Sequence, residues 1–159
     1  AVPLDLDTYV PHGSTALLDA IGDTIDRLGA RFAALPPADR PEHVTVAILT
    51  DGEENSSTRF TWHDVSKRIQ HQTEIYSWEF LFLGAGEDAI ATAAKMSIQA
   101  ENSSRFVADA AGQHAAMASF SRKSIGTRAR KSGHATAEQL ADADAPLESI
   151  VREEDQKRR

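Results

Sequence analysis

Two short polar segments of the chain carry the kind of oxygen atoms that bind hard metal ions. Ser14 and Thr15 supply hydroxyl groups in a turn before a helical pattern, and Asp51 and Glu53 supply carboxylates after the apolar run at residues 44–50. A cation such as Mg²⁺ takes about six oxygen ligands and keeps several waters when the protein supplies few. Thr15 and Asp51 are therefore the main candidates for metal ligands, and Ser14 and Glu53 are weaker ones.

Each of the two segments also has an explanation that involves no ligand. A serine or threonine before a helix is typical of an N-cap, where the hydroxyl accepts a hydrogen bond from a free backbone N–H. Asp51-Gly52 is a common turn pair. Only the combination favours a metal site, and whether the two loops are adjacent is not decided by the sequence.

The residues that follow Thr15 predict an amphipathic helix over residues 15–35. Apolar side chains recur at helical spacing, opposite the polar residues Asp19, Asp23 and Asp26. Two consecutive prolines end the pattern. The turn that contains Thr15 therefore lies at the N-terminal end of this helix.

The apolar run at residues 44–50 predicts a buried strand. It is β-branched and apolar on both faces, which is typical of a central parallel strand that helices cover on each side. Asp51 would then lie at the carboxyl end of that strand, where ligand sites gather in open parallel sheets.

The remainder of the chain continues the alternation of helices and strands. Thr61 precedes a helical pattern and has Asp64 three residues further on, as in a capping box. We then expect a strand over residues 76–83, a helix over 88–96, a strand over 105–107 and a helix over 112–130. This order predicts an α/β, Rossmann-like, doubly wound and mainly parallel sheet with only three strands. Residues 131–159 are polar and charged, which indicates a disordered or frayed helical tail.

Composition excludes several classes of function. The chain has 159 residues, a formal net charge of −7 and no cysteine. The acidic balance disfavours nucleic acid as a partner. The lack of cysteine excludes disulfides and thiol chemistry and fits a cytoplasmic location. No apolar run approaches the roughly 18 residues of a membrane span, so no membrane partner is expected.

Three segments resemble parts of the von Willebrand factor type A domain, in its stand-alone bacterial and phage form. The segment Gly13-Ser14-Thr15-Ala16-Leu17-Leu18-Asp19 is similar to the family's threonine loop, and Ile48-Leu49-Thr50-Asp51-Gly52-Glu53 is similar to its aspartate loop. Trp78-Glu79-Phe80-Leu81-Phe82-Leu83 resembles the next strand. The resemblance covers about residues 1–130. It implies a metal-ion-dependent adhesion site in which the Thr15 hydroxyl contacts Mg²⁺, Mn²⁺ or Ca²⁺, and Asp51 contacts the ion directly or through water.

The family's first loop, Asp-x-Ser-x-Ser, has no counterpart in the chain. The nearest match, Asp64-Val65-Ser66, falls inside a helical pattern and lacks the second serine. Against the family, residues 1–130 therefore look like a domain that is incomplete at its N-terminus, with a metal site that binds weakly. The resemblance implies a protein-binding module, not an enzyme, whose partner supplies an Asp or Glu to the metal.

Other interpretations remain open. Asp51, Glu53 and Glu54 would suit a Mg²⁺-dependent phosphoryl-transfer enzyme, but no lysine or arginine lies near that turn before Arg59. A metal-free interaction fragment is another alternative. Gly84-Ala85-Gly86 follows a predicted strand as in a dinucleotide-binding turn, but the acidic residues after it favour a plain tight turn. Because only three strands are expected, we also expect an exposed sheet edge through which the chain self-associates.

Overall fold

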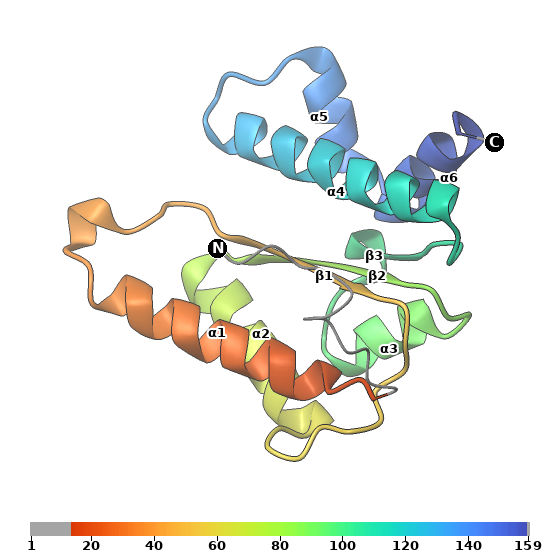
Figure 1. Cartoon of the computed structure of the whole chain (residues 1–159). Coiled ribbons are helices and arrows are strands. Elements are labelled where there is room, and N and C mark those ends of the chain that lie inside the picture. The colour runs from red at the N-terminus through yellow and green to blue at the C-terminus, as the bar shows by residue number, and fades with distance from the viewer. Residues whose placement is uncertain (1–13, 159) are drawn as a thin grey trace, which may run out of the picture.

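A parallel sheet of three strands, in the order β1-β2-β3, forms the centre of the structure (Figure 1). The structure is a computed structural model that describes residues 14–158, so Gly13 of the predicted threonine loop lies outside the described residues. The strands are β1 (Thr45–Thr50), β2 (Glu79–Gly84) and β3 (Ser103–Arg105). The expected α/β fold with an open parallel sheet is confirmed.

Three helices cover one face of the sheet: α1 (Leu17–Ala33), α2 (Trp62–Tyr76) and α3 (Ala89–Lys95). Their apolar side chains and those of the strands form one buried cluster, which includes Leu18, Ile21, Ile25, Ile48, Val65, Ile69, Phe80, Phe82 and Ala93. The helical spacing of the apolar residues after Thr15 produces the buried stripe of α1. The predicted capping box is also present, with Thr61 and Asp64 bonded reciprocally at the start of α2.

Three further helices lie on the opposite face: α4 (Ala110–Lys131), α5 (Ala137–Asp144) and α6 (Leu147–Gln156) (Figure 1). A second buried cluster joins α4 and α6 to β2, through Leu81, Leu83, Phe106, Ala116, Phe120, Leu147 and Val151. Helices α5 and α6 fall within residues 131–159, for which the sequence predicted a disordered or frayed helical tail. The large buried residues of α6, Leu147, Ile150 and Val151, lie on one face of that helix and belong to the core.

Buried charges hold α5 and α6 to α4. Lys123 is 4% exposed, and its Nζ donates hydrogen bonds to the carbonyls of Ala143 (2.8 Å) and Ala145 (2.6 Å) at the end of α5. Arg122 pairs with Asp142 of α5 and with Glu154 of α6. The charged residues of this polar segment therefore form ion pairs that join α5 and α6 to α4.

The predicted central position of β1 is wrong for the described residues. β1 pairs with β2 only and is an edge strand, while β2 occupies the centre. Ala47 is exposed and Leu49 is 42% exposed, because α4 and α6 pack on β2 and β3 and, among the described elements, none covers that face of β1. An apolar run indicates that a strand can be buried, but it does not say which neighbours the strand has.

Two strand boundaries differ from those predicted. The helix α2 continues to Tyr76 and ends at Ser77, which adopts the left-handed conformation with φ 55°, so β2 begins only at Glu79. The third strand, β3, lies two residues earlier than expected. Among residues 14–158, no helix is both long enough and apolar enough to cross a bilayer.

Candidate functional site

The two loops that carry the predicted ligands are adjacent. The backbone N–H of Thr15 donates a hydrogen bond to Oδ1 of Asn55 (2.8 Å), and the N–H of Asn55 donates to the carbonyl of Thr15 (3.1 Å). A Cβ atom placed on Gly52 would lie 2.6 Å from Oγ1 of Thr15. The hydroxyl of Thr15 therefore lies directly against the turn that presents Asp51.

Glu54 fastens these loops together through hydrogen bonds to both of its carboxylate oxygens. Oε2 accepts from the N–H of Leu18 (2.9 Å) and from the hydroxyl of Ser57 (2.7 Å). Oε1 accepts from the N–H groups of Ser56 (3.0 Å) and Ser57 (2.8 Å). Burial would raise the pKa of this carboxyl, but the hydrogen bonds outweigh it and the pKa is lowered. Glu54 thus acts as an ionised structural anchor.

Contacts from the same loop satisfy the free backbone N–H groups at the start of helix α1. Its N-cap is Ala16, and no side chain of its own first turn caps it. Instead, the N–H of Leu18 donates to Glu54, and the N–H of Asp19 donates to Oγ of Ser57 (3.0 Å). The helix-capping explanation of Ser14 and Thr15 therefore does not hold, since residues from the aspartate loop cap the helix.

Asp19 holds residues 58–60, the part of the loop that follows Glu54 and Ser57. The sequence pattern had placed Asp19 on the polar side of α1. It is 7% exposed, and its carboxylate accepts hydrogen bonds from the backbone N–H groups of Thr58 (3.0 Å), Arg59 (3.0 Å) and Phe60 (2.9 Å). The bond from Thr58 is the largest cause of a lowered pKa at Asp19. The helical period identifies apolar contacts, but it does not reveal that a loop with unpaired N–H groups will cover an acidic residue.

Two ion pairs join α1 to the loop and to α2. Arg59 pairs with Asp23, and Arg68 pairs with Asp26 at 2.9 Å. Both guanidinium groups lie over the ring of Phe60, at 5.7 and 4.7 Å from its centroid. Arg59, the first cation after the aspartate loop, is therefore engaged in structural contacts.

Asp51 and Glu53 differ from Glu54 and Asp19 because their side chains are exposed. They lie at the rim of a hollow of about 420 Å³ whose walls include Leu17, Trp62 and Phe82. The turn is fixed by Thr50, whose hydroxyl donates to the carbonyl of Gly52 (2.8 Å). Asp51 and Glu53 are thus the carboxylates of this loop that are free to meet a ligand.

The chemical type of these groups fits a hard cation, but their number is small. A hydroxyl at Thr15 and carboxylates at Asp51 and Glu53 are oxygen donors of the kind that Mg²⁺ prefers. Within residues 14–158, however, no three His, Asp or Glu side chains are grouped so that they could hold a metal ion. The described residues can supply part of a coordination shell, and water or another molecule would have to supply the rest.

The other patterns from the sequence have structural roles. Asp64 belongs to the capping box of α2, and the hydroxyl of Ser66 is hydrogen-bonded to that of Ser97 (2.6 Å). A Cβ on Gly84 would lie 2.9 Å from Cβ of Ala89, so this glycine allows β2 to approach α3 closely. The structure thus has a tight strand-to-helix turn at Gly84.

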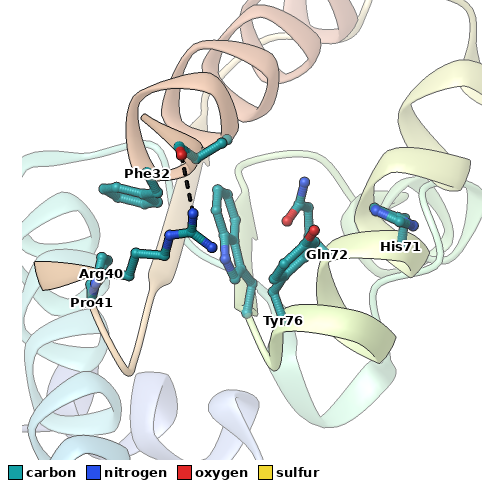
Figure 2. Close-up of a pocket in the computed structure, with 9 residues that line it drawn as sticks. Phe32, Arg40, Pro41, His71, Gln72 and Tyr76 are labelled. Atoms are coloured by element: carbon teal, nitrogen blue, oxygen red, sulfur yellow. Dashed lines mark hydrogen bonds between the residues drawn. The ribbon is translucent and has the colours of Figure 1, made fainter. Parts of the chain in front are cut away.

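A second hollow, of about 250 Å³, lies between the C-terminal ends of α1 and α2 (Figure 2). It is lined by Phe32 and Trp78, whose rings meet edge to face at 5.8 Å, and by Tyr76. Arg40 reaches into it and donates hydrogen bonds to the carbonyls of Ala33 and Leu35 (both 3.1 Å). Trp78 precedes β2, so this hollow lies at the opposite end of the strands from Asp51.

The chain matches no protein-family model, no curated protein and no solved structure in the comparisons with known proteins. The resemblance to type A domains therefore depends on the residues of the loops described above, and the function has to be argued from their geometry.

Proposed function

We propose that the chain is a metal-ion-dependent protein-binding module of the von Willebrand factor type A kind, in which Thr15 and Asp51 bind Mg²⁺. The contact between Oγ1 of Thr15 and Gly52 carries this proposal, because it brings a hydroxyl to the turn of Asp51. The position of that turn, at the carboxyl end of β1, also supports it. Glu53 and Ser14 are secondary ligands, and Mn²⁺ or Ca²⁺ are alternative ions.

The structural carboxylates prepare the site for binding. Glu54 and Asn55 hold the backbone of the threonine loop against the aspartate loop, so the donor atoms need little reorganisation when an ion arrives. A bound divalent cation would supply a positive centre that attracts a carboxylate of the partner. An Asp or Glu of the partner protein completes the coordination, and protein binding therefore depends on the metal.

The alternative of a phosphoryl-transfer enzyme has less support. It requires the carboxylates of Asp51, Glu53 and Glu54 to act together, but both oxygens of Glu54 are used in hydrogen bonds to the protein. It also requires a cation to hold the phosphate. Arg59 is paired with Asp23, and Lys95, which lines the same hollow as Asp51, lies over the ring of Trp62 at 5.2 Å from its centroid. With Mg²⁺ present, we expect generic phosphatase substrates to remain unchanged. Turnover that disappears in Asp51→Asn would favour the enzyme instead.

Titration with Mn²⁺ tests the metal assignment. Because Mn²⁺ is paramagnetic, it should broaden the amide signals around Thr15 and Asp51 selectively, with an affinity no tighter than about millimolar, since water supplies most of the shell. Calorimetry with Mg²⁺ should give the same range. Asp51→Ala should remove the selective broadening, whereas Asp39→Ala, which removes an exposed aspartate elsewhere, should retain it.

Two results would contradict this assignment. Micromolar binding that Asp51→Ala abolishes would show that the site is stronger than proposed. If the double variant Thr15→Ala, Asp51→Ala bound Mn²⁺ as the natural sequence does, the chain would be better described as a metal-free interaction fragment.

A further inference from the structure

The outer edge of β1 is unpaired within the part of the chain that the structure describes. β1 runs parallel to β2 in the register Ala47 to Leu81 and Leu49 to Leu83, and no other described strand adjoins it. The backbone N–H and C=O groups on its other side point away from the sheet. Such a row of groups is a template for another strand.

The residues of β1 do nothing to protect this edge. The strand Thr45–Thr50 has the sequence TVAILT, with no charge, proline or glycine. Edge strands in natural proteins commonly carry lysine, proline or a bulge that prevents further pairing. An uncharged run of β-branched and apolar residues instead favours pairing with a strand of the same character.

Among the described elements, none covers one face of β1. Leu81 and Leu83 of β2 are 0% exposed beneath the helical layer of α4 and α6, whereas their neighbours Ala47 and Leu49 lie outside that layer. Leu49 is 42% exposed. The unpaired edge therefore coincides with an apolar strip on the same strand.

We propose that β1 pairs with β1 of a second copy of this chain, antiparallel and centred on Ala47, to form a continuous six-stranded sheet. A two-fold axis perpendicular to the sheet makes the same surface complementary to itself. It also sets the Ala47 and Leu49 faces of both copies on one side, where the four side chains form a common apolar strip.

The charges at the two ends of β1 select the antiparallel direction. In this register, His43 of one copy lies opposite Asp51 of the other, so an imidazole meets a carboxylate at both ends. A parallel pairing would instead bring Asp51 and Glu53 of both copies together, and like charges side by side are unfavourable. The interface leaves the two candidate metal sites at opposite ends of the paired strands, each with its Asp51 opposite His43 of the other copy.

Sedimentation velocity of the 159-residue chain tests this proposal. Pairing of two six-residue strands buries less surface than a standard interface of about 1,600 Å², so we expect a dimer that dissociates on dilution. Ala47→Lys and Leu49→Lys should each give a monomer at concentrations at which the natural sequence is dimeric. Circular dichroism should confirm that each variant is folded. Ile90→Lys is the matched control, because Ile90 is 40% exposed on α3, on the other face of the sheet, and should leave the dimer intact.

Cysteine cross-linking tests the register. The chain has no cysteine, so Ala47→Cys introduces the only thiol. Directly opposed residues of antiparallel strands lie within the Cα separation of a disulfide. Oxidation should therefore cross-link Ala47→Cys to a covalent dimer, but not Ile90→Cys.

Several outcomes would overturn the proposal. The first is a monomer at all concentrations, and the second is a dimer that neither Ala47→Lys nor Leu49→Lys weakens. A monomer whose β1 amides are protected from hydrogen exchange would mean that residues 1–13 cover the edge, which also overturns it. Absence of the Ala47→Cys cross-link in a dimer that Leu49→Lys disrupts would contradict the pairing centred on Ala47.

Discussion

At the scale of single residues, carboxylates of the same chemical type have different roles in this loop. Asp51 and Glu53 are exposed, whereas Glu54 and Asp19 are held by hydrogen bonds from the backbone. The difference arises from which groups lie opposite each carboxylate after folding. Thr15 and Asp51 could be chosen from the sequence as candidate ligands because hydroxyls and carboxylates are recognisable ligand types. The anchoring role of Glu54 could not be predicted, since it depends on a hydrogen bond from the backbone N–H of Leu18, in a helix that is distant in the sequence.

Gly52 determines how closely the Thr15 hydroxyl approaches the aspartate loop. Since a Cβ on Gly52 would lie 2.6 Å from Oγ1 of Thr15, Gly52→Ala should push the hydroxyl away. We expect the selective broadening by Mn²⁺ to be lost. Gly86→Ala is the control, because the nearest atom to its Cβ lies at 3.9 Å. Unchanged broadening in Gly52→Ala would mean that Thr15 is not a ligand.

Gly22 has a similar role in the packing of α1 against the loop. A Cβ on Gly22 would lie 2.6 Å from ring atoms of Phe60, a ring that the guanidinium groups of Arg59 and Arg68 also approach. We expect Gly22→Ala to lower the free energy of unfolding in urea by about 1–3 kcal/mol, as overpacking does. Gly29→Ala should have no such cost, since its Cβ has only Gln72 at 3.6 Å. Equal stability of the two variants would show that Phe60 can move.

At the scale of elements, helix α6 shows why a polar sequence can still be ordered. Its buried residues are Leu147, Ile150, Val151 and Glu154, at the spacing of one helical face. Only three of these are apolar, so the composition of residues 131–159 gave no sign of a core contact. Glu154 is buried with Arg122, Lys157 and Arg158 around it. The position of this helix therefore depends on charges from two parts of the chain, its own C-terminal end and α4.

The surroundings of Glu154 predict a pH dependence of stability. Hydrogen bonds from Lys157, Arg158 and Arg122 outweigh burial and lower the pKa of Glu154 from 4.5 to about 2. The folded state therefore holds its proton less tightly than the unfolded state, and the stabilisation is complete above pH 4.5 and is lost as the pH falls toward 2. Glu154→Gln should lower the melting temperature at neutral pH and flatten its decline in that acid range. Glu148→Gln, at an exposed position on the same helix, should not.

Leu147 connects α6 to the sheet. It is 0% exposed and belongs to the cluster that contains Leu81 and Leu83 of β2. We expect Leu147→Ala to reduce the free energy of unfolding by about 2–5 kcal/mol, as large-to-small changes in cores do. Leu140→Ala, at a residue that is 40% exposed on α5, should cost much less. A cost no greater than that of Leu140→Ala would support the disordered tail that the composition suggested.

At the scale of the whole molecule, the sequence predicted the order and type of the elements from α1 to α4, but neither the helices α5 and α6 nor the position of β1 in the sheet. The helical spacing after Thr15 and the apolar runs that form β1 and β2 are local signals. The structure has a helix and two strands at these positions. Whether a strand is central depends on how many strands join it and where α4 to α6 pack. These contacts join residues that are far apart in the chain, and the spacing of apolar residues within one segment does not predict them.

The position of β1 also predicts where the molecule exposes apolar surface. Trp78 is only 5% exposed and its ring meets that of Phe32, while Leu49 remains 42% exposed at the edge. At concentrations too low for self-association, we expect the chain to bind a hydrophobic dye and still give the near-ultraviolet circular dichroism of fixed aromatic rings. Leu49→Lys should weaken dye binding and leave that spectrum unchanged. Dye binding that persists in Leu49→Lys, together with loss of the aromatic spectrum, would instead indicate a molten state in which apolar surface is exposed throughout the molecule.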